Sequence, residues 1–440
     1  MTKHEFLKIM EYELGNLNEN IKSDILSDFR DHFEIAEKSG KSEEEICQIL
    51  GNPKEIAREF IADIDSYVNL RNDNDEPESR EKAPQQQNPD SNRAPKNINN
   101  IYIEAIACDI RIAGGNYSEV AVEFEGDHQD RFVTEIIGDT YSVKELPHRK
   151  YANNFLQRLI QVNWHDNVKM NVFVPEHFSG NIDARTASGD VAAGNLLNLG
   201  LLKLKTASGD VELNSISTKN NASTSTGSGD ITVNKVASGE KINFSTGSGD
   251  VDLENCAAEN DISISTGSGD VEIQSCIAKN NILISTGSGD VESNNSVGTL
   301  KASTGSGEIE AYGHTGTVYG STGSGDINIK TNEMSAAIKY STGSGDVNIE
   351  CGKISENINI STGAGDIRLR VLELTADIIG KTGFGDIKAE IGRESDVRFV
   401  LKTGRMGEKR NNFPVKDSQH EAKYKVSFET NVGDITVKAC

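Results

Sequence analysis

The spacing of hydrophobic residues differs between two parts of the chain. Over residues 1–70, apolar side chains recur every three or four residues, as on one face of a helix, and Phe6, Met10 and Leu14 belong to the first such stripe. Over residues 98–440 the period is two, with apolar and polar residues alternating in short runs typical of strands. Residues 71–97 contain no aliphatic residue larger than Ala. We expect a disordered linker there, because such a segment buries too little apolar area to fold.

The helical period of residues 1–70 predicts four short helices. A second apolar stripe runs over residues 21–36. Ser42 and Glu45 have the spacing of a capping box, which opens a third helix by satisfying amides of its first turn. Asn52 and Pro53 predict the start of a fourth, with Asn as the N-cap and Pro at the first helical position. The sequence therefore predicts a small helical bundle.

A five-residue motif repeats through the second part of the chain. The usual spacing is twenty residues, and two steps are shortened to eighteen. The motif Thr-Gly-Ser-Gly-Asp begins at Thr226, Thr246, Thr266, Thr286, Thr322 and Thr342. Close variants begin at Thr186, Thr206, Thr304, Thr362 and Thr382, a degenerate copy at Thr430, and a further irregular copy at Thr403.

One unit indicates how the repeat folds. Ile262 and Ile264 alternate with serines, a turn starts at Thr266, and Val271 and Ile273 then alternate with polar residues. Each unit supplies two short strands, which bury their apolar face only by stacking on neighbouring units. The predicted fold class is mostly β, a repetitive β-solenoid with about 20 residues per coil preceded by a small all-α helical module. The alternative, an antiparallel propeller or sandwich, is disfavoured by the short period and the constant turn.

Residues 98–180 alternate less regularly. We expect them to form the opening rungs and the cap of the same solenoid, so that the β domain covers 98–440. Residues 151–165 interrupt the alternation and predict a loop or a short helix.

Two stretches resemble known bacterial families. The runs EFLKIMEYEL and KSEEEICQILGNPKEIAREF make residues 1–65 similar to the HAAS signalling domain. That resemblance implies a signalling or interaction role, often associated with PadR-type transcriptional regulators. The run NVFVP, followed by the repeats, resembles the "putative-adhesin" β-strand-repeat family over most of residues 98–440. This second resemblance implies a fold but no defined chemistry.

The charge of the chain limits its partners. The formal net charge is −23 and the pI is about 4.8, which disfavours nucleic acid and anionic membranes as partners. No segment has the eighteen or more consecutive apolar residues of a membrane span, and the charged N-terminal stretch is unlike a secretory signal. We therefore expect a cytoplasmic protein without membrane insertion.

The repeated Asp residues should stack along one edge of the solenoid. Like charges at strand spacing repel one another, so either turn amides or bound cations must compensate them. The spacing differs from that of calcium-binding nonapeptide repeats, which favours turn capping and no metal. The alternative is a calcium ladder formed by Asp230, Asp250, Asp270, Asp290, Asp326 and Asp346.

Nothing in the sequence singles out a catalytic residue or a cofactor site. The turns are short and uniform, no paired acids stand out, and neither a nucleophile elbow nor a phosphate loop is present. Cys256 and Cys276 occupy equivalent places in successive units, so they either form a disulfide or remain small buried thiols, which a reducing cytoplasm favours. An outward serine ladder is expected at Ser225, Ser245, Ser265, Ser285, Ser341 and Ser361, and we interpret it as a solvated strand position.

These patterns predict a non-enzymatic signalling or scaffold protein. Residues 1–70 would dock on a protein partner, a PadR-type transcriptional regulator, while the solenoid acts as a rigid scaffold or recognition surface. One alternative is an adhesin-like envelope or cell-surface binding protein, and another is a calcium-stabilised repeat array. The oligomeric state stays open.

Overall fold

The computed structural model describes residues 1–15, 98–126, 131–146, 168–414 and 421–440, with isolated positions at 22, 26, 29, 30, 33, 42, 43, 46, 47, 52–54 and 57. The chain divides into two compact units, one of residues 1–88 with 146–165 and the other of 89–145 with 166–440. The linker expected over 71–97 and the loop or helix expected over 151–165 lie outside the described residues.

The helical unit begins with α1 (Lys3–Glu13). Thr2 is its N-cap: the Glu5 amide donates to Thr2 Oγ1 at 3.3 Å, and the Thr2 amide donates to Glu5 Oε2 at 3.0 Å. This reciprocal pair is a capping box, and it satisfies amides that the first turn of a helix leaves without partners. The sequence analysis did not identify it.

The predicted apolar stripes meet in one core. Phe6 packs against Phe29 and Phe33, with ring centroids 5.6 and 5.7 Å apart, and Met10 and Leu14 are fully buried beside them. Other buried members are Leu26, Ile46, Cys47 and Ala57.

The predicted start of the fourth helix is confirmed. Asn52 Oδ1 accepts the Lys54 amide at 3.1 Å, and Pro53 is helical. Glu45, the second residue of the predicted capping box, lies outside the described residues. No helix in the described part of the chain combines the length and the apolar content needed to cross a bilayer.

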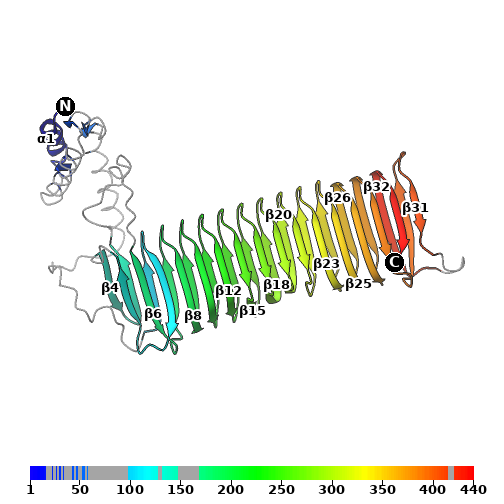
Figure 1. Ribbon diagram of the computed structural model, residues 1–440, viewed down its shortest axis with the longest axis horizontal. Coiled ribbons are helices and arrows are strands. Elements are labelled where there is room, and N and C mark those ends of the chain that lie inside the picture. Colours follow the sequence, from blue (N-terminus) through cyan, green and yellow to red (C-terminus); the bar gives the residue numbers. More distant parts are fainter. Residues whose placement is uncertain are drawn as a thin grey trace, which may run out of the picture. The chain divides into compact units, whose positions relative to one another are not determined.

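The second unit is a parallel β-solenoid, as predicted (Figure 1). β16 (Ile262–Ser265) pairs in parallel with β13 (Ile242–Ser245) on one side and with β18 (Ile277–Ser285) on the other. The pairing is in register, so that Ile262 lies between Ile242 and Ile282. Because identical positions stack, the aliphatic residues form one continuous narrow core in which Ile262 and Ile264 are 0% and 2% exposed.

The strands of the stacked coils follow one another with short connections. In chain order they are β7 (Asn181–Arg185), β8 (Val191–Leu199), β9 (Leu201–Lys205), β10 (Val211–Thr218), β11 (Ala222–Ser225), β12 (Ile231–Ser238), β13, β14 (Val251–Glu254), β15 (Ala257–Ala258), β16, β17 (Val271–Gln274), β18, β19 (Val291–Asn294), β20 (Val297–Thr304), β21 (Ile309–Tyr312), β22 (Val318–Thr322), β23 (Ile327–Met334), β24 (Ile338–Thr342), β25 (Val347–Ile354), β26 (Ile358–Ala364), β27 (Ile367–Leu374), β28 (Ile378–Phe384) and β29 (Ile387–Ile391).

A second corner in each of the earlier coils was not predicted. Between β17 and β18, Ser275 has a φ of 54°, and residues with φ between 49° and 58° recur at Asn195, Ser215, Lys235, Asn255 and Asn295. This left-handed conformation bends the coil inside β8, β10 and β12 and directly after β14, β17 and β19, where the sequence predicted only two short strands and one turn per unit. The corner was missed because glycine, the usual residue at such a position, is absent from these places. In β23, β25 and β27, each of eight residues, no residue with such a φ occurs.

The N-terminal end of the solenoid is closed by strands that come later in the chain. β1 (Asn100–Glu104) and β2 (Asp109–Gly115) pair with β7 and β8 on one side. On the other side they pair in parallel with β5 (Thr140–Glu145) and β6 (Lys169–Pro175). β4 (Phe132–Ile137) and β3 (Ala121–Glu125) then add antiparallel to β5 and β6. The expectation that residues 98–180 form the opening rungs and cap is therefore met.

The C-terminal end has the same kind of inversion. β32 (Tyr424–Val432) and β33 (Ile435–Ala439) lie between β28/β29 and the coil of β30 (Val397–Thr403) and β31 (Lys409–Asn412). The turns predicted at Thr403 and Thr430 both exist, but the one at Thr430 stacks directly on the coil of Thr382. The last segment of the chain thus occupies the slot before the last coil.

Candidate functional site: the turn ladder

The Asp residues of the turns form a ladder of hydrogen bonds in two runs, one ending at Glu308, whose amide donates to Asp290 Oδ1 at 2.7 Å, and one beginning at Asp326. The amide of Asp230 donates to Oδ1 of Asp210 at 2.9 Å, and the amide of Asp250 donates to Oδ1 of Asp230 at 2.8 Å. The same contact joins each of these pairs: Asp190–Asp210, Asp250–Asp270, Asp270–Asp290, Asp326–Asp346, Asp346–Asp366 and Asp366–Asp386. One oxygen of each accepting carboxylate is therefore occupied by a backbone amide, the compensation that the sequence favoured.

The threonine that opens each turn is buried and bonded twice. Thr246 Oγ1 donates to the carbonyl of Gly229, one coil earlier, at 2.8 Å, and it accepts the amide of Gly249 in its own turn at 3.1 Å. Thr246 is 7% exposed. From the sequence, this threonine was recognised only as the first residue of the turn. Its recurrence at the first position of every copy was the signal for this role.

The second glycine is required by close approach of the neighbouring coil. A Cβ atom built on Gly249 would overlap the carbonyl of Gly229, and one on Gly229 would overlap that of Gly209. Any side chain here would push two coils apart, so only glycine fits. The serine between the two glycines faces solvent instead.

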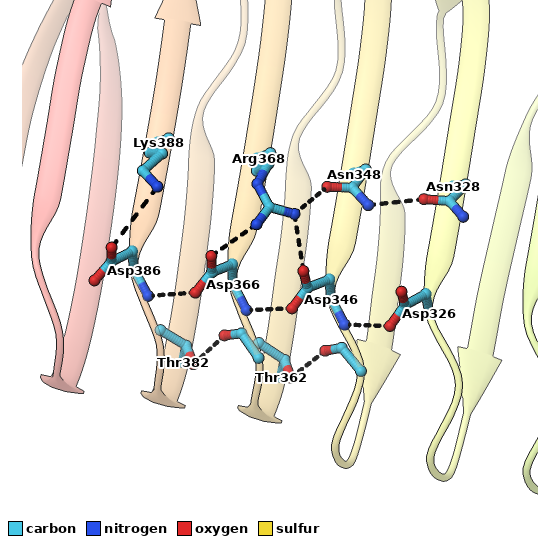
Figure 2. A network of polar contacts seen from close by, with 12 residues as sticks. Asp326, Asn328, Asp346, Asn348, Thr362, Asp366, Arg368, Thr382, Asp386 and Lys388 are labelled. Carbon is cyan, nitrogen blue, oxygen red and sulfur yellow. Dashed lines mark hydrogen bonds and ion pairs between the residues drawn. The ribbon is translucent and has the colours of Figure 1, made fainter.

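The later part of the ladder carries compensating cations (Figure 2). The Arg368 guanidinium bridges Asp346 and Asp366, with both N–O distances at 2.8 Å, and it also donates to Asn348 Oδ1 at 3.1 Å. The hydrogen bond to Asp346 is the main cause that raises the pKa of Arg368. Lys388 lies 3.8 Å from Asp386. Arginine suits this place because its planar fork reaches two carboxylates at once.

The earlier part of the ladder is strongly acidic. No ion pair to Asp210, Asp230, Asp250, Asp270 or Asp290 is recorded in the described part of the chain. Burial, followed by the charges of Asp250 and Asp230, raises the pKa of Asp252. Burial and the neighbouring Asp326 and Asp290 likewise raise the pKa of Glu308.

The six Asp residues of the predicted calcium alternative lie in this ladder, on adjacent turns except that the turn of Glu308 separates Asp290 from Asp326. Among the described residues, no group of three or more His, Cys, Asp or Glu side chains is arranged to hold a metal ion. The calcium ladder stays a prediction.

Comparison with known families identifies both parts of the chain. Residues 98–261, 219–357 and 259–438 each match the family model described as Toastrack DUF4097. The chain belongs to the Toastrack DUF4097 family. Residues 5–59 match the HAAS family model. Both resemblances proposed from the sequence are confirmed.

Other comparisons add little about this Toastrack protein. No curated protein matches the chain. Among solved structures, it is similar to a crystal structure of a "putative cell adhesion protein" from Clostridium sporogenes, with 10% sequence identity. The match covers 79% of this chain and 95% of that chain, but its TM-score of 0.18 is too low to carry an argument.

The predicted serine ladder exists on the outside of the Toastrack coils. Ser245, Ser265 and Ser285 line a shallow groove of about 440 Å³, and Ser321 Oγ lies 3.2 Å from Ser341 Oγ. Strand pairing places Ser225 beside Ser245 and Ser341 beside Ser361.

Cys256 and Cys276 lie in adjacent Toastrack coils, as predicted, and both are buried free thiols. The hydrogen bond with Cys276, followed by burial, raises the pKa of Cys256. Because the thiolate is the reactive form, a buried thiol with a raised pKa is unreactive.

A buried ion pair starts the turn ladder at the N-terminal end. Glu145 Oε2 accepts the amides of Ile106 and Ala107 at 2.6 and 3.2 Å. Arg131 Nε lies 3.1 Å from Glu145 Oε1, and both side chains are under 10% exposed, at 8% and 5%. Arg131 Nη2 also donates to the carbonyl of Ala107 at 3.1 Å. Glu145 therefore caps the first turn, where no earlier Toastrack turn can supply an Asp. Arg131 and Glu145 are brought together by the antiparallel pairing of the consecutive strands β4 and β5, in which Glu145 lies opposite Phe132. The pair was not predicted, because the irregular alternation of residues 98–180 did not reveal this hairpin.

Proposed function

We propose that this Toastrack protein is a non-enzymatic scaffold in signalling, in which the HAAS module docks on a partner protein and the solenoid serves as a rigid recognition surface. The contacts of the turn ladder support this proposal most directly. The threonine hydroxyl, the Asp amide and one Asp oxygen of each regular turn bond to the neighbouring coil. Groups used in this way stiffen the rod and are not available to act on a substrate.

The HAAS module supplies the proposed docking face. Tyr12 on α1 is 83% exposed, although the neighbouring Phe6 and Met10 are fully buried. Tyrosine is enriched at the energetic centres of protein interfaces, since its ring buries a large area at low entropic cost. We infer that Tyr12 anchors the partner, for which a PadR-type transcriptional regulator is the proposed class, and that the complex forms in the cytoplasm.

The test is capture of partners from native lysate. Three baits are compared: the full chain, the full chain with Tyr12→Ala, and the chain from residue 89 onward. We expect a PadR-type regulator on the full chain, much less on Tyr12→Ala, and none without residues 1–88. Glu11→Ala, at the adjacent exposed position of α1, is the matched control and should retain the partner. Capture by the solenoid bait alone would contradict the proposed division of roles.

Two alternatives have their own tests. An adhesin-like surface protein would appear in the envelope or culture fraction and not in the cytosol. A calcium-stabilised array is favoured by the run of Asp residues between Asp210 and Asp290, for which the described part of the chain records no cation partner. Its melting temperature would fall on addition of a chelator and rise again with calcium, whereas an unchanged melt removes this alternative.

A further inference from the structure

One position of the turn changes character at the C-terminal end of the solenoid. The residue before the second glycine is serine in the preceding coils, at Ser188, Ser208, Ser228, Ser248, Ser268, Ser288, Ser306, Ser324 and Ser344. In the last four coils it is Ala364, Phe384, Val432 and Met406. Phe384, Val432 and Met406 are 64%, 50% and 94% exposed, so these apolar side chains gain nothing from the core of the solenoid.

These four residues are consecutive only in space. Strand pairing places Ala364 beside Phe384, and Phe384 beside Val432. The turn of Met406 stacks next, because the Glu408 amide donates to Asp434 Oδ1 at 2.8 Å and the Gly404 amide donates to the Thr430 carbonyl at 3.0 Å. The inverted order of the last two coils thus assembles an apolar ridge, defined here as Phe384, Val432 and Met406. Such a patch marks an interaction site more often than an isolated exposed apolar residue does.

The outermost coil, which contains Met406 of the apolar ridge, also contains three exposed cations. Lys402, Arg405 and Lys409 are exposed, and no ion pair is recorded for them in the described part of the chain. Glu408, two residues after Met406, is already bound by Arg410 at 2.7 Å.

The chain is also polarised in charge along the solenoid. Residues 378–440 hold 12 Lys or Arg against 9 Asp or Glu, whereas residues 182–310 hold 8 against 17. Residues 311–377, between these two regions, hold 5 Lys or Arg against 8 Asp or Glu. At about 4.8 Å per coil and a Debye length of about 8 Å at physiological salt, the outermost coil of β30 and β31 is screened from all but the nearest coils. The whole-chain charge of −23, which disfavoured an anionic membrane in the sequence analysis, does not describe this end.

We propose that this end of the solenoid binds peripherally to an anionic lipid bilayer. The apolar ridge enters the interfacial layer, and Lys402, Arg405 and Lys409 contact lipid phosphates. The shape of the apolar ridge favours lipid over protein as its partner. Its residues protrude from turns, so a rigid protein would need a matching concave surface. A lipid interface, in contrast, accommodates protruding side chains. The charge selects anionic lipid, and it opposes association of two such ends with one another.

The test is flotation of the full-length protein with phosphatidylcholine vesicles, with and without phosphatidylglycerol. We expect binding only to the anionic vesicles, and weaker binding as salt is raised. The variant F384S/V432S/M406S restores the serine of the other coils, so it should fold normally and lose on the order of tenfold or more in affinity. The variant K402Q/R405Q/K409Q should lose on the order of a hundredfold, at about fivefold per cation.

A reciprocal variant controls for exposed apolar residues as such. S228F/S248V/S268M places the same three side chains on the acidic coils, and the proposal requires that this set alone confers no extra vesicle binding. Failure of the unaltered protein to float, or flotation that both triple variants leave unchanged, would overturn the proposal. It is overturned equally if the protein dimerises without vesicles and F384S/V432S/M406S abolishes the dimer, because the occupant is then a second copy.

Discussion

The amide of Asp434 donates a hydrogen bond to Oδ1 of Asp386 at 2.9 Å, across 48 residues of sequence. In the regular coils the same contact spans 20 residues, as between Asp230 and Asp250. The difference arises because the coil of β30 and β31 is made first along the chain but lies outermost. The slot between it and β28/β29 is filled by β32 and β33. The turn ladder is therefore complete at this end only when the last segment of the chain is in place.

The fit of Phe428 over Gly380 should hold this last coil in its register. The two residues are paired, Phe428 is fully buried, and a Cβ atom on Gly380 would come within 2.7 Å of the Phe428 ring. We expect Phe428→Ala to destabilise the chain by about 3–5 kcal/mol and Gly380→Ala by about 1–3 kcal/mol, the first through a cavity and the second through overpacking.

Urea denaturation of the two single variants and the double variant tests this fit. Because alanine at position 380 fills space that Phe428→Ala vacates, the double variant should lose less stability than the two losses added together. Strictly additive losses would show that the two side chains do not interact. Gly320, which makes the same kind of contact with Tyr340, is the matched site for repeating the cycle.

The buried threonine hydroxyl should be the most valuable polar group of a regular turn. Thr246→Val keeps the shape but leaves the Gly249 amide and the Gly229 carbonyl without their partner, at a cost of about 1–3 kcal/mol. Thr246→Ser keeps the hydroxyl and should recover most of that loss. A larger loss in Thr246→Ser than in Thr246→Val, measured by urea denaturation, would mean that the methyl group and not the hydroxyl matters.

The repeat made the solenoid predictable from the sequence, but the order of the strands at its two ends was not predictable. Any one coil contains its own two strands and turn, so the alternation around Thr266 was enough to place Ile262, Ile264, Val271 and Ile273 in the core. The order of the end coils depends on which strand fills which slot, and no local pattern records that choice. The apolar ridge arises there, and for this reason it was outside the reach of the sequence.

The Asp ladder shows a similar division. The sequence indicated that stacked carboxylates need compensation, but the amide of the next Asp became identifiable as the donor only with the register of the strands. Asn348 and Arg368 are paired on neighbouring strands, and each lies two residues after an Asp of the ladder. Because side chains alternate along a strand, each lies on the same face as that Asp. Comparison of the residues at this position of each repeat could therefore have predicted from the sequence that Arg368 binds Asp346 and Asp366.

The acidic part of the ladder should make stability depend on pH through Asp252. The pKa of this carboxyl is raised in the folded chain, by burial first and then by Asp250 and Asp230. The folded state therefore holds this proton more tightly, and the contribution to stability is present below the ordinary value of 3.8 and lost as pH rises through the folded pKa. Asp252→Asn should stabilise the chain near neutral pH and have little effect in acid.

Urea midpoints of Asp252→Asn, measured near neutral pH and below 3.8, test this expectation. Glu240→Gln, which removes a charge away from the ladder, controls for the change in net charge. A gain of equal size at both pH values would show that titration of Asp252 is not the cause.

The buried pair of Arg131 and Glu145 should be the most sensitive point of the N-terminal cap. Replacing Arg131 by Met leaves the Glu145 charge buried, and replacing Glu145 by Gln leaves the guanidinium without its carboxylate, so each should cost about 3–5 kcal/mol. The double variant should be less destabilised than either single one, because no buried charge then remains uncompensated. Arg185→Met, which breaks the partly exposed pair with Asp183, should cost about 1 kcal/mol or less. Hydrogen exchange of the Ile106 and Ala107 amides, which Glu145 binds, would report the loss of the cap directly. Unchanged protection in Glu145→Leu, which has no acceptor oxygen, would contradict this role.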